Sequence, residues 1–286
     1  MQAESADSAN RTALNSIRYG LLLFCLDASF GHAEQLPLWE AGVGIGAATL
    51  PHYRGSDQSK TWVLPVPYLV YRGEALKVDD DRRLRGLLGD KVELEVSLYG
   101  SPPARDNDAR QGMPDLDATL EIGPSLNIAL LRSKNGAEKL ELRLPVRIVI
   151  AADFPHFRHA GWIFQPNLSV DFKNVLGNRG WNLGLAGSLI YTDRRYNQYF
   201  YAVDPSFATA DRPAFSPSGG YAGTALIAAV SKRFPNFWVG AFAKWDSVAG
   251  AAFADSPLVR TRNNFSGGFG IAWILGAATV KVEAEN

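Results

Sequence analysis

Two neighbouring runs of alternating apolar and polar residues, within Thr119–Ile150, constrain the fold of this chain most strongly. From Lys139 the second run reads K-L-E-L-R-L-P-V-R-I-V-I, with a leucine, valine or isoleucine at every other position. Successive side chains of a strand point to opposite faces, so a period of two predicts strands and excludes a helix. The first run, Thr119–Leu130, alternates in the same way, and Asn135-Gly136 between the runs is a strong hairpin signal. The sequence therefore predicts a β-hairpin with one apolar and one polar face.

Both strands of this hairpin have the length of about 9–11 residues that a tilted transmembrane strand needs. Similar alternation recurs along the chain, in the following segments: Trp39–Ala48, Trp62–Tyr71, Val92–Tyr99, Trp162–Lys173, Trp181–Tyr191, Tyr221–Ser231, Phe237–Asp246 and Phe265–Trp273. Glycines at alternate positions of the first segment fit a curved sheet and not a nucleotide-binding loop. With Glu74–Leu88 read as two short strands the count is about 12, and without that pair it is 10. No run of about 18 apolar residues exists, so no transmembrane helix is expected.

The predicted connections differ in length on the two sides of the sheet. The turns near Asn135, Asn178 and Pro235 are short. The loops around Asp106, His156, Pro205 and Ala252 are mostly long. These long loops include Asp153–Ala160 and the segment from about Arg194 to Gly219. Short periplasmic turns and long extracellular loops are typical of outer-membrane barrels. A soluble two-sheet sandwich would show the same alternation. Aromatic residues at the strand ends and a polar opposite face favour an all-β, antiparallel transmembrane β-barrel.

The first 33 residues have the pattern of a secretory signal peptide. Arg11 and Arg18 precede a short apolar stretch, and Gly31-His32-Ala33 supplies small residues before the expected cleavage site. The predicted barrel domain is 34–286, in which 276–286 is either part of a longer last strand or a tail. The one cysteine, Cys25, lies in the leader, so the predicted mature chain has no disulfide or cysteine-based metal site. Balanced charge, 29 basic and 29 acidic residues, argues against nucleic-acid binding through bulk charge.

Several segments, in order along most of the predicted mature chain, resemble the MipA/OmpV family of outer-membrane proteins. The matching segments are these: Gly42–Gly46, Pro51-His-Tyr-Arg-Gly-Ser-Asp57, Pro65-Val-Pro-Tyr68, Tyr71-Arg-Gly73, Asp106-Asn-Asp-Ala-Arg110, Gly112-Met-Pro-Asp-Leu116, Gly219-Gly-Tyr221 and Ser256-Pro-Leu-Val259. The chain departs from the family at its end, because residues 274–286 follow Trp273 without a terminal aromatic residue.

The resemblance implies a barrel in the outer membrane of a Gram-negative bacterium, associated with the cell-wall machinery. The best-known family member is a non-enzymatic scaffold that bridges a lytic transglycosylase and a murein synthase. Other members are discussed as adhesins or as osmotic or antibiotic-response proteins. The resemblance therefore implies outer-membrane lipid and these two murein (peptidoglycan) enzymes as partners, and it carries over no catalytic residue and no cofactor.

Charged residues on the predicted inner face form the candidate site. They are Glu93, Glu95, Glu121, Glu141, Arg143, Arg147, Asp171 and Lys173. Opposite charges on adjacent strands pair across a sheet, which favours an ion-pair network that plugs the lumen. The alternative is a polar pore for small solutes, that is, a channel or porin.

Enzymatic and metal-binding readings have weaker support in the sequence. The three histidines after the leader are His52, His156 and His159, and a barrel hydrolase would need one of them beside a serine and an orienting carboxylate. Exposed loop histidines are the simpler interpretation. Four aspartates could bind calcium but do not have the spacing of an EF-hand, so solvated loop carboxylates are favoured: Asp106, Asp108, Asp115 and Asp117.

Overall fold

The computed structural model of the protein describes residues 35–71, 92–133, 137–153, 155–175 and 180–283. The described strands are β1 (Gln35–Pro37), β2 (Trp39–Pro51), β3 (Ser59–Tyr71), β4 (Val92–Ser101), β5 (Ala118–Arg132), β6 (Glu138–Asp153), β7 (His156–Phe164), β8 (Asn167–Asn174), β9 (Trp181–Thr192), β10 (Gly220–Arg233), β11 (Phe237–Ser247), β12 (Asn263–Ala277) and β13 (Lys281–Glu283). Short helical segments are η2 (Asp108–Arg110), α3 (Arg194–Tyr201) and η3 (Pro205–Phe207).

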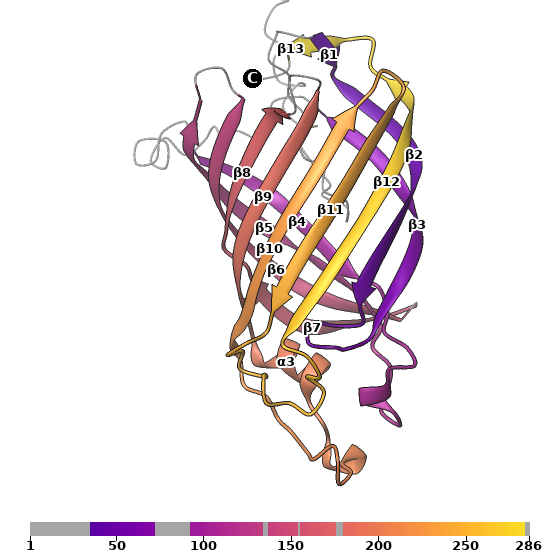
Figure 1. Cartoon of the computed structure of the whole chain (residues 1–286), viewed down its shortest axis with the longest axis vertical. Coiled ribbons are helices and arrows are strands. Elements are labelled where there is room, and N and C mark those ends of the chain that lie inside the picture. The colour runs from indigo at the N-terminus through magenta and orange to yellow at the C-terminus, as the bar shows by residue number, and fades with distance from the viewer. Residues whose placement is uncertain (1–34, 72–91, 134–136, 154, 176–179, 284–286) are drawn as a thin grey trace, which may run out of the picture.

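Eleven of these strands form one antiparallel sheet that curls into a tilted barrel (Figure 1). The order is β3-β2-β12-β11-β10-β9-β7-β6-β5-β4, and β8 pairs with β6 and β9 beside this path. The two strands predicted within Glu74–Leu88 lie outside the described residues, in the segment that connects β3 to β4. None of the described helices has the length and apolar character of a membrane span.

The hairpin predicted at Thr119–Ile150 is confirmed as β5 and β6. Leu120 pairs with Ile150 and Leu126 with Leu144, so their apolar side chains share the outer face. On the inner face, Glu121, Asn127, Glu141 and Arg147 are buried, whereas large apolar side chains on the outside of the sheet are exposed. An apolar exterior around a polar interior is what a barrel in a membrane requires, because lipid cannot solvate polar groups.

Aromatic residues occupy both rims of the outer face. Trp39, Trp181 and Trp273 lie near the end with the short turns, and Trp162 and Tyr191 lie near the end with the long loops. Trp39, Trp162, Tyr191 and Trp273 are exposed on the outside of the sheet. Two such girdles are the interfacial anchors of a membrane barrel.

The alternating glycines of β2 permit a close approach to β12. A Cβ atom on Gly44 would lie 2.7 Å from the Cβ of Ala272, which is closer than van der Waals contact allows. It would overlap the Ile271 carbonyl oxygen even more strongly. Gly42 meets the Trp273 carbonyl in the same way. The predicted role of these glycines, relief of crowding in a curved sheet, is therefore seen at the β2–β12 seam.

We expect Gly44→Val to impair formation of this seam, because the added side chain would force β2 away from β12. Overpacking of this kind costs about 1–3 kcal/mol, and the clash with backbone here places the cost at the upper end. The measurement is the fraction of heat-modifiable, folded barrel on a semi-native gel. Ala47→Val, on the outer face of the same strand, is the control. Equal folding of both variants would contradict the assignment.

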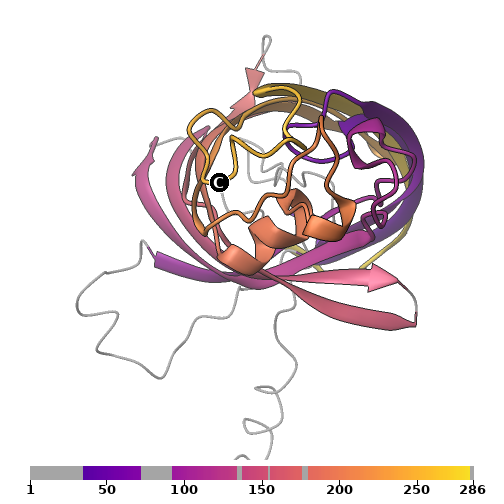
Figure 2. The same cartoon turned by 90° about the horizontal axis from the view of Figure 1, so that it is seen from below.

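One predicted loop is wrong. Residues 153–160 are not a long loop, because β6 and β7 form a tight hairpin in which Asp153 pairs with His156 (Figure 2). The register shifts between Val149 and Ile150, where Gly161 adopts a positive φ of 124°. Such a bulge adds one residue and reverses the alternation of side chains, so a period-two pattern cannot reveal the strand beyond it.

The single strand predicted at Trp162–Lys173 is divided. β7 ends at Phe164 and β8 begins at Asn167, with Gln165 and Pro166 between them. Proline has no N–H to donate to a ladder, so the strand breaks there. β7 and β8 nevertheless both pair with β6 and with β9, and the alternation of faces continues through the break.

The ladder between β2 and β12 continues beyond the barrel wall. β12 reaches Ala277, Ala278 donates its N–H to the Trp39 carbonyl, and β13 then pairs with β1. This two-stranded ribbon lies at the end with the short turns (Figure 1). Residues 276–283 thus belong to strands or their connection.

Candidate functional site

The centre of the predicted polar cluster is a buried ion pair between β5 and β6. Arg147 Nε donates to Glu121 Oε2 at 2.9 Å, and the two side chains are 5% and 6% exposed. The other guanidinium nitrogens of Arg147 donate to Ser97 Oγ at 3.2 Å and Gln165 Oε1 at 2.6 Å. The pair therefore ties together β4, β5, β6 and the β7–β8 connection inside the lumen.

A second group lies closer to the short turns. Arg143 Nη2 donates to Glu141 Oε2 at 2.7 Å and lies 3.6 Å from Asp171 Oδ2, while Lys139 Nζ lies 2.5 Å from Glu141 Oε1. The Glu141 side chain is 4% exposed, whereas 39% of the Arg143 side chain is exposed. The guanidinium of Arg143 thus keeps an accessible face within the lumen.

The remaining predicted residues lie on the edges of this cluster. Glu95 Oε2 accepts from Asn127 Nδ2 at 2.8 Å, and Asn127 in turn accepts from the hydroxyl of Ser125. Glu93 pairs with Asn127 in the backbone register, and its side chain is outside the described part. Lys173 lies at the end of β8, where its N–H donates to the Ala137 carbonyl.

Two further ion clusters were not among the predicted site residues. Near the long loops, Asp246 of β11 binds both Arg54 Nε at 2.7 Å and Lys244 Nζ at 2.5 Å. Lys244 and Arg147 both approach the ring of Tyr99, each 5.9 Å from its centroid, so Tyr99 links this cluster to the central pair. The alternation of β11 could have identified Lys244 and Asp246 as inner-face charges. It could not have identified Arg54, because Arg54 lies in a loop, which has no periodic pattern.

The second unpredicted cluster lies at the short-turn end of the lumen. Arg233 donates to both carboxylate oxygens of Glu40, with Nε at 3.2 Å from Oε2, and Glu40 is fully buried. Tyr68 donates to the same carboxylate, and Trp238 packs beside Tyr68. Glu40 stands at an inner-face position of a predicted strand, but its partner Arg233 is 193 residues away in sequence.

Three buried polar atoms on β8, β9 and β10 have no protein partner among the described residues. They are Ser169 Oγ, Asn182 Nδ2 and Ser231 Oγ. Asn182 and Ser231 face each other in the register. Buried polar groups left unpaired by protein are usually satisfied by water, so we expect bound water at these three atoms.

The long loops fold into a cap over the other end of the barrel (Figure 2). We define the cap as residues 52–58, 102–117, 193–219 and 248–262. Asp193 caps α3 by accepting from the N–H of Tyr196 at 2.9 Å, and α3 carries a row of aromatic residues into the interior. Tyr201 stacks on Phe253 with ring centroids 3.6 Å apart, and both side chains are fully buried or nearly so.

Hydrogen bonds between loops hold the cap together. Tyr53 donates its hydroxyl to the Leu258 carbonyl at 2.8 Å, and burial raises its pKa to about 12, so the phenol stays a donor. Tyr201 donates to the Arg54 carbonyl at 2.9 Å. Arg212 binds the carbonyls of Ala109 and Gln111, which joins two loops about 100 residues apart. The cap is thus a small hydrophobic core with a polar frame.

Segments that carried the family resemblance meet in this cap. Asn107 donates to Ser56 Oγ at 3.1 Å and to the ring of His52, and Asn264 bonds Gly55 and Ser56. Leu258, from Ser256–Val259, accepts from Tyr53. The sequence located the segments, but their assembly into one body depends on contacts between residues about 50 and 200 positions apart.

The ring of His52 is expected to make the cap sensitive to acid. Burial and nearby Lys60 hold the pKa of His52 below its ordinary value of 6.5, and its neutral Nδ1 accepts from Asn107 Nδ2 at 3.1 Å. Because the pKa of His52 is lower in the folded state, the neutral ring stabilises the folded cap fully above pH 6.5. This stabilisation is lost as the pH falls toward the lowered pKa.

We therefore expect amide exchange at residues 104–110, corrected for intrinsic rates, to be a few-fold faster at pH 5 than at pH 8. His52→Gln, which cannot be protonated, should remove most of that difference. An unchanged pH effect in the variant would show that another group is responsible.

The candidate catalytic and metal residues do not assemble into a site. His159 accepts from Arg195 and lies beside the Gly161 carbonyl, and His52 contacts Asn107, while His156 begins β7. Asp117 pairs with Arg158 at 3.0 Å, and Asp108 accepts from Gln58. Within the described ranges, no group of three or more histidine, cysteine or acidic residues could hold a metal ion.

The apolar exterior, aromatic girdles and ion-paired interior define the class of this protein as an outer-membrane β-barrel. The profile of the family described as MltA-interacting protein MipA matches residues 43–275, and the chain belongs to that family. It is 25% identical over 258 residues to outer membrane protein OmpV of Vibrio cholerae and 24% identical over 253 residues to Omp26La of Vibrio anguillarum. Each alignment covers 84% of this chain and 84% of the relative. The protein is therefore placed in the outer membrane.

Two solved outer-membrane proteins are distantly similar in structure. OprG of Pseudomonas aeruginosa has a TM-score of 0.24 and 9% identity, with 86% of this chain and 96% of that chain covered. The toluene transporter TbuX of Ralstonia pickettii has a TM-score of 0.26 and 8% identity, with coverages of 89% and 73%.

Proposed function

We propose that this barrel is a non-enzymatic scaffold that engages murein synthesis and remodelling enzymes at its periplasmic end. The observation that carries the proposal is the cap, because the long loops lie across the mouth through which a solute would pass (Figure 2). Stacked Tyr201 and Phe253 and the Arg54–Asp246 pair hold these loops together and to the barrel. The description of the matching family, an MltA-interacting protein, supports a lytic transglycosylase as one partner. A murein synthase is the second proposed partner.

The partner surface in this proposal is the end with the short turns. Pro235 and Asn236 are exposed in the β10–β11 turn, and the β1–β13 ribbon extends the wall on the same side (Figure 1). We assign this end to the periplasm because outer-membrane barrels have their short turns there. Export by a signal peptide cleaved after Ala33 completes the proposal, and the N-terminal sequence of the purified protein tests it.

The experiment is direct binding of the folded barrel, immobilised in detergent, to a purified lytic transglycosylase and a purified bifunctional murein synthase. We expect binding that weakens with Asn236→Arg in the β10–β11 turn and is unaffected by Phe157→Ala at the opposite end. Failure of both enzymes to bind would overturn the scaffold proposal.

A channel is the second candidate, and one observation favours it. The Arg143 side chain is 39% exposed inside the lumen, near the unpaired polar atoms of β8–β10. A conducting wild-type protein in planar bilayers would support this function, with the ion selectivity changed by Arg143→Glu and Arg147→Glu.

A further inference from the structure

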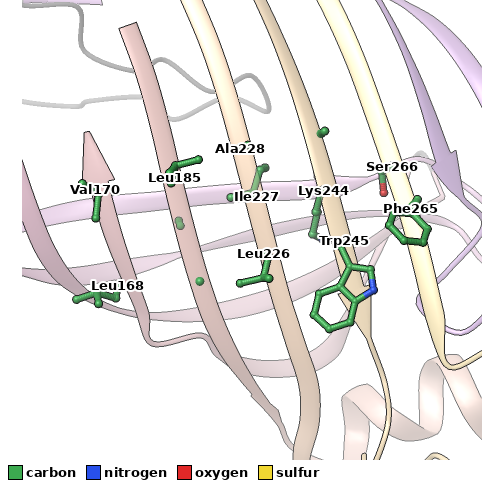
Figure 3. Close-up of a pocket in the computed structure, with 13 residues that line it drawn as sticks. Leu168, Val170, Leu185, Leu226, Ile227, Ala228, Lys244, Trp245, Phe265 and Ser266 are labelled. Carbon is green, nitrogen blue, oxygen red and sulfur yellow. The ribbon is translucent and has the colours of Figure 1, made fainter. Parts of the chain in front are cut away.

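The outer face of the barrel has an apolar groove across β8–β12 (Figure 3). Its volume is about 650 Å³, within the range of ligand pockets. Leu168, Leu185 and Leu226 line it on β8, β9 and β10, and Trp245 and Phe265 line it on β11 and β12. The groove is open to the exterior and is lined mainly by carbon.

The floor of the groove exists because small residues coincide in register. Ala228 pairs with Ala243, and Ala243 pairs with Gly267 on the next strand. One step toward the long loops, Leu226 pairs with Trp245 and Trp245 with Phe265, which forms a raised row. Depth therefore comes from a drop in side-chain size between neighbouring rows of the same sheet face.

The groove begins near the membrane interface and leads toward the middle of the wall. Trp245 stands two residues before the end of β11 at the long-loop side, and Ala243 lies deeper. Tryptophan favours the interface, where its indole N–H meets polar lipid groups. This orientation suits a molecule with a polar head at the rim and a thin apolar chain below it.

We propose that the groove seats one acyl chain of a membrane lipid whose headgroup lies at the long-loop rim. The groove is continuous with the membrane-facing surface, and burial of its apolar lining is favourable. A second copy of the barrel fits less well. A two-fold contact centred here would place groove against groove and leave both unfilled.

Retention of a lipid probe by the purified protein tests the proposal. Folded barrels are exchanged into detergent, incubated with lipid A, the acylated lipid of the leaflet on the long-loop side, washed, and examined by native mass spectrometry. We expect one lipid to remain on the wild type and on the control Ala41→Leu, which lies on the outer face of β2. The groove-filling variant Ala228→Leu/Ala243→Leu should retain about tenfold less.

Leu226→Ala provides an independent check, because it removes a wall instead of filling the floor and should also lower retention several-fold. It remains informative if the double variant does not fold, which the heat-modifiability gel reports. Equal retention by the wild type and Leu226→Ala, or a lipid-free dimer of the wild type in the same spectra, would overturn the proposal. A lipid A analogue with eight-carbon acyl chains should bind more weakly than lipid A itself, since it fills less of the groove.

Discussion

Replacing Arg147 by methionine is expected to lower the free energy of unfolding by about 3–5 kcal/mol, because it leaves the Glu121 carboxylate buried without its cation. The two side chains are 5% and 6% exposed, so water cannot readily take the place of the guanidinium. Ser97 and Gln165 would lose their donors as well. Urea unfolding of the barrel in lipid vesicles measures the change.

A double variant distinguishes the contribution of the Glu121–Arg147 ion pair from that of the other contacts of Arg147. Glu121→Leu/Arg147→Met removes both charges, and replacing a buried pair by apolar groups is often close to neutral. We therefore expect it to recover most of the stability lost in the single variant. Arg158→Met, which removes the exposed partner of Asp117, is the matched control and should change stability by less than about 1 kcal/mol. A double variant as unstable as Arg147→Met would show that the guanidinium matters through its other contacts.

Loosening the cap is the second change with a large expected effect. Tyr201→Ala/Phe253→Ala removes rings stacked at 3.6 Å and the hydroxyl that binds the Arg54 carbonyl. Truncating a buried aromatic side chain costs about 3–5 kcal/mol. A loss of that size raises the population of open mouths on the order of a hundredfold or more. Planar bilayers should then show frequent conducting steps that the wild type lacks.

The matched control is Phe157→Ala, an exposed aromatic residue on the β6–β7 hairpin at the same end. It should leave the bilayer as silent as the wild type. Within the conducting variant, Arg143→Glu should move ion selectivity toward cations, because the accessible face of that guanidinium would become negative. A double variant that folds and stays silent would show that the lumen is blocked below the cap.

The walls of the barrel were predictable from sequence, and the cap was not. Period-two alternation identified Thr119–Ile150 as a hairpin because each residue's neighbours two positions away share its environment. The same rule failed at Gly161, where one inserted residue reversed the faces of β7. Pro166 broke a predicted strand without interrupting the alternation, so the pattern alone could not locate the break.

The candidate site divides in the same manner. Glu121, Glu141, Arg143 and Arg147 were predictable as inner-face residues because alternation turns them inward. Glu121 and Arg147 pair between adjacent strands as expected, whereas Glu141 and Arg143 pair along the same strand, β6. Arg54 could not be placed, since a loop has no period and its carboxylate partner lies 192 residues away. The family resemblance marked the cap segments as significant without revealing that they touch.

The pairing of β2 with β12 has a consequence for how this protein must be made. Ile45 and Ile271 face each other across a stretch of chain on the order of 220 residues, and the entropy cost of bringing segments together grows with the length between them. Pairing this distant cannot start folding, because nearby hairpins form faster. Until the seam forms, β2 and β12 expose unpaired edges that invite aggregation. The biogenesis of this barrel therefore depends on protecting two edges that no local contact can protect, and the β1–β13 ribbon adds pairs that lock the seam once it has closed.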